Sequence, residues 1–383
     1  MFQKQCQSPK SFSKKMAQQQ QIPDFYLDAP NVSSDSEVMV ALLNMGGPKT
    51  NKDVKAFLER LFKDDLIIRF PLSKVLQSFF AWLIVTLRWK KTAQRYQKIG
   101  GGSPIYAATE RQRRALDQEL KARGRNLSVV ISFNYSEPLP EQTIQVIKAA
   151  GKSVLLPISL YPHYSRATTE ANIHHLKKAA GRIYPELKFL KPPSYYLHEG
   201  FIQSYVDRIR EEIVVAKGES LDDFYLLFSA HGLPLYFLME GDIYPFQIAQ
   251  SVALILDRLN RKDRWLISYQ SSVGPMQWMK PSTDEVLQAM AKGGIKKVLV
   301  VPVAFVSDHI ESLCEIDMEY RQLAEEAGIH DFRMSKAPEC HPLFIKALAD
   351  AVEQSLPPKF TATGDFVASA PILSKKEEVK NVQ

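Results

Sequence analysis

The chain carries one pattern twice, and this internal repeat constrains its fold more than any other feature. Residues 149–165, AAGKSVLLPISLYPHYS, and residues 292–310, KGGIKKVLVVPVAFVSDHI, share a glycine, a lysine and a Val-Leu run that contains a proline. In both halves short apolar runs alternate with helical segments, which is typical of parallel sheets. We predict an α/β protein of two similar Rossmann-like domains, each a parallel sheet flanked by helices, with a cleft between them.

The apolar runs and the turn residues after them give the expected elements. In the first half we predict strands at 38–43, 129–133 and 154–158, with helices from about 51 and near 141–150. In the second half we predict strands at 225–228, 265–269 and 298–303, with a helix near 283–292. Each half therefore contains at least one strand–helix–strand unit.

The length of 383 residues exceeds what one hydrophobic core usually supports. We place the domains at 38–210 and 211–356. Residues 1–37 are expected to be a disordered or targeting tail, since the first 22 contain lysines, no acids and no apolar core of a secretory signal. Residues 357–383 lose periodicity and are expected to form a mobile tail.

Charge and cysteine content exclude several classes of protein. The net charge of +7 is modest, and the basic residues are interspersed with 42 acidic ones. We therefore expect no nucleic-acid partner and favour an anionic membrane surface. The three cysteines, Cys6, Cys314 and Cys340, lie far apart, which argues against a disulfide framework. No Cys-x-x-Cys is present, so a cysteine-ligated metal centre is not expected.

Polar residues follow two of the predicted strands. His231 lies on a Ser-Ala-His-Gly-Leu-Pro turn, where a neutral imidazole can act as a base or metal ligand, or simply hydrogen-bond a loop carbonyl. Ser307 or Asp308 is expected to cap a helix that carries an acidic row, Glu311, Glu315 and Glu319. Such a row suits a proton or cation relay, although a solvated helix face is the simpler alternative.

Aromatic and thioether side chains gather at the predicted strand ends. They are Met45, Tyr135, Tyr161, Tyr164, Met276 and Trp278. They form either plain core or a cleft for a large planar apolar ligand. Overlaying the first strands of the halves places Met45 opposite His231. The glycine-rich segment 99–105 lacks the spacing of a nucleotide-binding loop.

Residues 70–89 are rich in aromatic and aliphatic side chains. The uninterrupted apolar run Phe79–Leu87 is too short to span a bilayer. Tryptophans and basic residues at its edge favour a membrane-facing lip that rests in the interface, with a buried helix as the competing interpretation.

Several long motifs in order closely resemble those of the ferrochelatases, from about Val38 to Val352. They are Leu-Asn-Met-Gly-Gly-Pro, Ile-Gly-Gly-Gly-Ser-Pro-Ile, Tyr-Pro-x-Tyr-Ser, Phe-Ser-Ala-His-x-Leu-Pro, Gln-Ser-x-Val-Gly-Pro-Met-x-Trp and Ser-Asp-His-Ile-Glu. The resemblance implies a lyase that inserts Fe²⁺ into protoporphyrin IX, the last step of haem synthesis, and releases two protons. Iron is then a substrate, and no permanently bound cofactor is implied.

The resemblance also implies roles for individual residues. His231 and Glu311 would be the catalytic and metal-binding pair on opposing walls of the cleft, with Asp308 and Glu315 continuing a proton or metal path and His309 a structural neighbour. The residues implied to bind the porphyrin are Met45, Asn134, Tyr135, Tyr161 and Trp278, with Lys98 as a further candidate.

The chain departs from the family pattern in three places. Asn134 stands where some relatives carry arginine, and Lys98 or Arg166 would compensate as a propionate contact. Arg166 occupies a position that is cysteine in animal members, and the C-terminal cysteine cluster is missing, so no iron–sulfur cluster is expected. Met45, in place of the tyrosine of members that use coproporphyrin, favours protoporphyrin IX.

The resemblance leaves the cellular location and the oligomeric state of the protein partly open. We expect a cytoplasmic protein attached peripherally to the inner membrane, or an organellar one if the N-terminal tail is a presequence, and we leave a homodimer open. The alternatives are a chelatase for cobalt or coproporphyrin and a non-catalytic haem-binding protein.

Overall fold

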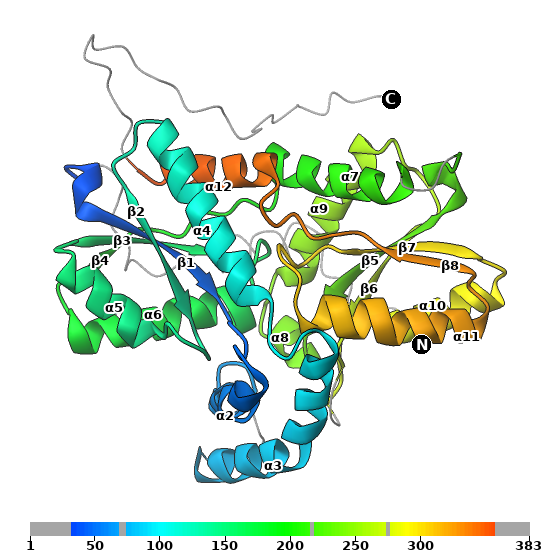
Figure 1. The fold of residues 1–383 in the computed structure, drawn as a ribbon, viewed down its shortest axis with the longest axis horizontal. Helices are drawn as coiled ribbons and strands as arrows, with labels where there is room; N and C mark the ends of the chain where they lie inside the picture. The colour runs from blue at the N-terminus through cyan, green and yellow to red at the C-terminus, as the bar shows by residue number, and fades with distance from the viewer. Residues whose placement is uncertain (1–31, 69–73, 215–217, 273–275, 357–383) are drawn as a thin grey trace, which may run out of the picture.

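A computed structural model describes residues 32–68, 74–214, 218–272 and 276–356, which form two four-stranded sheets side by side (Figure 1). The first sheet has the order β2-β1-β3-β4, with β1 Val38–Asn44, β2 Ser128–Phe133, β3 Val154–Ser159 and β4 Lys188–Phe189. The second has the order β6-β5-β7-β8, with β5 Tyr225–His231, β6 Trp265–Gln270, β7 Lys297–Pro302 and β8 Asp331–Met334. All pairings are parallel, so the predicted fold class is confirmed.

Helices connect the strands of each sheet. The helices of the first half are α2 Val54–Lys63, α3 Lys74–Lys98, α4 Ile105–Ala122, α5 Pro140–Ala149 and α6 Ala171–Ile183, with the 3₁₀-helices η2 Asp35–Glu37 and η3 Asn51–Asp53 and the π-helix η4 Arg166–Glu170. Those that follow are α7 Glu199–Val214, α8 Leu235–Met239, α9 Tyr244–Arg258, α10 Thr283–Lys292, α11 Arg321–Ala327 and α12 Pro342–Gln354, with η5 Leu221–Asp223 and η6 Glu311–Tyr320. The predicted tails lie outside the described residues, apart from 32–37.

Strand β1 shows why its apolar run folds as a central strand. All seven of its residues are buried, because the sheet is covered on both faces. Val38, Val40 and Leu42 face one hydrophobic cluster, and the alternate residues Met39, Ala41 and Leu43 face another that includes α5 and α6.

One hydrophobic cluster runs through both halves of the molecule. It joins residues of β1 and α4 to residues of β5, β7, α7 and α12. The boundary expected between residues 210 and 211 falls within α7, a continuous helix that packs on α9 and α12. The two sheets thus share buried apolar surface.

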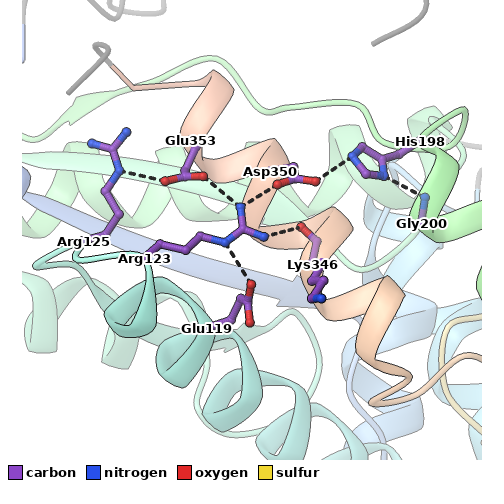
Figure 2. A network of polar contacts seen from close by, with 8 residues as sticks. All are labelled: Glu119, Arg123, Arg125, His198, Gly200, Lys346, Asp350 and Glu353. Atoms are coloured by element: carbon purple, nitrogen blue, oxygen red, sulfur yellow. Dashed lines mark hydrogen bonds and ion pairs between the residues drawn. The ribbon is translucent and has the colours of Figure 1, made fainter. Parts of the chain in front are cut away.

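Helix α12 ties the end of the second half back to the first half (Figure 2). Arg123, just beyond α4, donates to Asp350 at 2.5 Å and to Glu353 at 2.8 Å, both on α12. Arg125 donates to Glu353 at 3.2 Å, and His198 contacts Asp350 at 3.0 Å. Polar contacts and apolar packing therefore hold α12 across the two halves.

The internal repeat reappears as matching geometry. A π-helix begins at Arg166, nine residues after Pro157 of β3, and another at Glu311, nine residues after Pro302 of β7. π-Helical turns are rare and often mark functional sites.

Helices α2 and α3 project from one side of the body, below both sheets in the view of Figure 1. On α3 the side chains of Phe79, Trp82 and Leu87 are 53%, 53% and 73% exposed. A fully buried helix is therefore excluded for the described part of this segment. No helix among the described residues has the length and apolarity needed to cross a bilayer.

Candidate active site

His231 and Glu311 meet at the carboxyl edge of the second sheet. His231 ends β5, and Glu311 begins η6 after the neighbouring strand β7. The Nδ1 atom of His231 lies 3.1 Å from Oε2 of Glu311. The expectation that they stand on opposing walls is wrong, because chain segments that follow adjacent parallel strands emerge on the same edge. The two side chains are 33% and 28% exposed, so both reach the surface of the site.

Glu311 also contacts a second imidazole. Nε2 of His309 lies 3.3 Å from the same Oε2 atom. His309, expected to be only a structural neighbour, is therefore part of the candidate site. Its position two residues before Glu311 in the sequence could have indicated this contact. Its ring packs edge-on against Phe305, with centroids 4.2 Å apart.

The two ionisable groups shift each other's pKa in opposite directions. Burial would lower the pKa of His231, but the charge of Glu311 and the hydrogen bond to it raise this pKa above its usual value. Burial would raise the pKa of Glu311, but His231 and then His309 lower it well below its usual value. The pair thus favours a protonated imidazole beside a carboxylate.

Glu315 lies one turn further along η6 and is 9% exposed. Its Oε1 accepts from the Ser271 amide and the Tyr320 hydroxyl, both at 2.9 Å, and its Oε2 accepts from the Ser271 hydroxyl at 2.5 Å. Burial and then the charge of Glu311 raise the pKa of Glu315 despite these donors. Ser271 and Tyr320 were missed from the sequence, where no charge or spacing marks them.

Asp308 is placed differently from the predicted helix cap. Ile310 occupies the N-cap position of η6, and the Ser312 hydroxyl donates to Asp308 at 3.1 Å. The cap prediction is therefore wrong, because the chain is already helical at Ile310. Burial raises the pKa of Asp308. Within the described residues, no group of three or more His, Cys, Asp or Glu side chains could jointly hold a metal ion.

Glu319 ends the acidic row and contacts the C-terminal part of α3. Its Oε2 accepts from Nη2 of Arg95 on α3 at 2.8 Å, and its Oε1 accepts from Sγ of Cys314 at 3.6 Å. Arg95 was not singled out in the sequence, because its partner is more than two hundred residues away.

The first half of the chain contributes two tyrosines that the charge of Glu311 affects. The Tyr161 hydroxyl lies at the backbone of Met45, and burial and then the charge of Glu311 raise the pKa of Tyr161. Burial and the same carboxylate also raise the pKa of Tyr96 on α3, which sequence reasoning missed. The charge of Glu311 therefore acts on two tyrosines of the first half.

The overlay of the two halves needs a correction of one residue. Asn44 is the last residue of β1, as His231 is of β5, and each pairs with the last residue of the next strand, Phe133 or Gln270. Met45 follows the strand and packs with the cluster that includes Tyr135 and Ile310.

An open pocket of about 260 Å³ lies between the halves. It is lined by Asn44, Ile105, Leu160, Tyr161, Phe305, Val306, Ser307 and His309. The pocket therefore lies at the ends of β1, β3 and β7, on the side of both sheets that carries the candidate site.

The remaining predicted porphyrin contacts are in different environments. Tyr135 is 2% exposed and its hydroxyl donates to Asp64, while Asn134 donates to Asn172 at 2.6 Å. Trp278 lies beside Gly232, next to His231. Lys98 is exposed at the end of α3.

Arg166, the other proposed propionate contact, already has acidic partners. Its guanidinium pairs with Glu240 at 2.6 Å and with Glu170 at 3.7 Å.

Fold and site together define a class of protein: a two-sheet α/β enzyme with a histidine–carboxylate pair at the junction of its halves. The ferrochelatase family model matches residues 37–356. The chain is 42% identical to the ferrochelatase of Gloeobacter violaceus over 325 residues, which cover 84% of this chain and 98% of that protein. It is 42% identical to the ferrochelatase of Synechococcus elongatus over 83% of this chain and 82% of that one. The chain belongs to the ferrochelatase family.

Family membership gives the reaction. The chain is a lyase that inserts Fe²⁺ into protoporphyrin with release of two protons, in haem biosynthesis. Among solved structures, SirB from Bacillus subtilis with Fe³⁺ matches with a TM-score of 0.48 and 15% identity, over 83% of this chain and 95% of that one. That likeness is too distant to bear on function.

Proposed function

We propose that His231 and Glu311 are the groups that receive Fe²⁺ and take the two pyrrole protons of protoporphyrin IX. The observation that carries the proposal is the hydrogen bond between two partly exposed, oppositely shifted groups at the junction of the halves. Imidazole with carboxylate suits a borderline divalent ion. Both groups also serve as proton acceptors.

The arrangement couples metal binding to release of the proton on His231. A cation at Glu311 weakens the charge that raises the pKa of His231, so the imidazole gives up its proton as the metal arrives. The neutral ring is then available as a base for a pyrrole N–H. Glu315 and Asp308, whose pKa values burial raises, would pass these protons or the metal along the acidic row.

We propose Met45, Tyr161 and Trp278 as the walls of the porphyrin site. Asn134, Tyr135 and Lys98 remain candidate contacts for the rim of the macrocycle or its propionates. A thioether at Met45 suits the vinyl-bearing edge of protoporphyrin IX better than the more acidic coproporphyrin. Insertion requires a distorted macrocycle, because a planar free base leaves no room for metal and two protons together.

We further propose that the exposed apolar side chains of α3 attach the enzyme peripherally to a membrane. Phe79, Trp82 and Leu87 face solvent, and Arg88, Lys90 and Lys91 follow on the same helix. Attachment at the cytoplasmic face of the inner membrane, an organellar location, pairing of two copies and the lack of an iron–sulfur cluster stay predictions.

The direct test is anaerobic incubation of the full chain with protoporphyrin IX and Fe²⁺. Conversion of the free-base absorbance spectrum to that of haem is the expected result, and its loss in E311Q with porphyrin binding retained assigns the chemistry to this pair. A variant that binds porphyrin and still inserts iron at the wild-type rate contradicts the assignment.

A further inference from the structure

Residues 303–309 carry part of the candidate site, yet they form neither helix nor strand. This 303–309 segment follows β7, contains Asp308 and His309, and ends just before Glu311 at the start of η6. No ladder of backbone hydrogen bonds holds such a segment. Its shape therefore depends on the partners that its own carbonyl and amide groups find.

The ring of His309 depends on the 303–309 segment for its orientation. Its Nε2 atom lies 3.3 Å from Oε2 of Glu311, but its Nδ1 atom is buried and has no hydrogen-bond partner among the described residues. Imidazoles in functional sites are usually oriented by a hydrogen bond at the second ring nitrogen. In this chain the edge-on contact with Phe305 and the position of the backbone orient the ring instead.

Two buried side chains hold carbonyl groups of the 303–309 segment. The hydroxyl of Tyr205 on α7 donates to the carbonyl oxygen of Phe305 at 2.8 Å. Nε2 of Gln112 on α4 donates to the carbonyl oxygen of Val306 at 3.0 Å. Both side chains are fully buried. Because α4 packs on β2 of the first sheet, the contact of Gln112 ties the segment to the other half of the molecule.

Gln112 uses both hydrogens of its amide group. The second goes to the carbonyl oxygen of Glu339 at 3.2 Å, and the Glu339 amide donates in turn to the Val306 carbonyl at 2.9 Å. Because both partners are carbonyl oxygens, the NH₂ end of the side chain must face them. Oε1 of Gln112 is left buried without a hydrogen-bond partner among the described residues.

Glu339 adopts a left-handed backbone conformation, with φ of 48°. Such a conformation is uncommon for residues other than glycine, and it persists where surrounding contacts determine it. This backbone and the unmatched acceptor of Gln112 both cost stability. The arrangement therefore favours a contact that is kept for the position of the 303–309 segment rather than for the stability of the fold.

The same segment faces the first half across the pocket between the halves. Val306 and His309 line that pocket together with Tyr161. Since Val306 precedes His309 by three residues, a shift of the backbone at Val306 changes the position of the imidazole relative to both Glu311 and Tyr161.

We propose that Gln112 is a positioning residue for iron insertion, which fixes the backbone at Val306 from the first half and thereby holds the ring of His309 against Glu311. The proposal rests on the function proposed above, in which Glu311 acts on the metal and the protons. Without the amide donors of Gln112, fewer molecules hold the imidazole in the productive geometry, and small displacements of this kind slow catalysis.

The experiment measures kcat and KM for Fe²⁺ and protoporphyrin IX in the anaerobic assay with the full chain. Q112M keeps the volume of the side chain and removes its donors. We expect it to lower kcat about tenfold, with the KM for porphyrin changed less than about threefold, because the substrate contacts remain. Q112N keeps an amide on a shorter side chain and should give a kcat between those of Q112M and the wild type. Urea denaturation shows whether each variant is folded, and Q112N decides if Q112M is not; a wild-type kcat in the deciding variant overturns the proposal.

A double variant separates positioning of His309 from general damage. H309A should lower kcat, and adding Q112M to H309A should lower it by no more than about a further twofold, because the ring that Gln112 positions is gone. A general loss of active enzyme would instead multiply the two effects. Full multiplication in Q112M/H309A overturns the proposal, and so does an H309A variant with the wild-type kcat.

Arg111 provides a matched control on the same helix. It precedes Gln112, pairs with the carboxylate of Glu339 at 2.8 Å and is 53% exposed. R111Q should keep kcat within about twofold of the wild type, as expected for an exposed ion pair. A loss equal to that of Q112M would assign the effect to the α4 surface in general and would overturn the role of the Gln112 amide.

The E311Q variant tells the two proposals apart. Retained insertion by E311Q would contradict the proposed function itself. An inactive E311Q together with a wild-type kcat in Q112M would contradict the positioning role of Gln112 alone.

Discussion

Arg166 and Glu311 each begin a π-helix, one in each half of the chain. Each is the first residue of a π-helix that begins nine residues after the proline of the equivalent strand. Glu311 accepts from His231, whereas Arg166 pairs with Glu240. The π-helix of the second half therefore begins with the carboxylate, and that of the first half begins with a guanidinium held by acidic partners.

H231A and E311Q should each lower kcat by about 10²- to 10⁴-fold, the usual contribution of a positioned acid or base. Binding of protoporphyrin IX, followed by quenching of protein fluorescence, should change much less, because the proposed function has both groups act on the metal and protons. The exposed His330 offers a control. H330A should keep full activity, and a comparable loss there would point to general damage.

Replacing Phe79, Trp82 and Leu87 together by serine should abolish cosedimentation with vesicles that contain anionic lipid. Burying one such side chain is worth about 1.5–3 kcal/mol, so the triple change should weaken partitioning well beyond tenfold. Stability should change little, since these side chains are exposed. Met239 is 87% exposed on α8, and M239S should bind vesicles as the wild type does. Equal binding by the triple variant would exclude α3 as the attachment site.

R123A should lower the free energy of unfolding by about 2–3 kcal/mol, measured by urea denaturation. The change leaves Asp350 and Glu353 without their shared partner, and the loss stays below the 3–5 kcal/mol typical of fully buried pairs because Arg123 is 21% exposed. The exposed Arg182–Glu141 pair is the comparison, and R182A should cost less than about 1 kcal/mol. Similar losses of unfolding free energy in R123A and R182A would show that the contacts of Arg123 with α12 do not stabilise the protein.

His163 should make the protein less stable as the pH falls below about 6.5. Burial lowers the pKa of this histidine from 6.5 to about 3, and the ring is 1% exposed with Nε2 near the Ser251 hydroxyl at 2.9 Å. Between these values only the unfolded chain takes up the proton, so the free energy of unfolding falls by roughly 1.4 kcal/mol per pH unit. Above pH 6.5 the contribution is constant.

The matching variant is H163Q, which keeps a polar contact for Ser251 and cannot titrate in this range. Urea denaturation at several pH values between 5 and 8 should give H163Q a shallower slope than the wild type below pH 6.5. Parallel curves would show that His163 is not the group responsible.

The central strands were predictable from the sequence because they are short, apolar and bounded by glycine or proline. Strands β1, β3, β5 and β7 fall where expected. The edge strands β4 and β8 were missed, since Lys188–Phe189 and Asp331–Met334 are short and carry charged residues that suit a sheet edge.

The sequence indicated two residues that the structure brings into contact, but not the geometry of their contact. The motifs identified His231 and Glu311, but only the strand order places them on one wall rather than two. Residues such as Arg95 and Ser271 act through partners that are distant in sequence, and a single sequence contains no record of such pairs. Tyr135 illustrates the opposite error. An aromatic residue at a strand end was expected to line a ligand site, but the structure buries it with its hydroxyl bonded to Asp64.

Helix α12 leaves the ribosome after every other described element, yet it covers α4, which is made early. The part of α4 that packs on α12 therefore stays uncovered through most of translation, whereas the part that packs on β2 is covered early. For the same reason a fragment that stops short of α12 would lack the cover of both halves, so neither half is expected to fold as an autonomous unit.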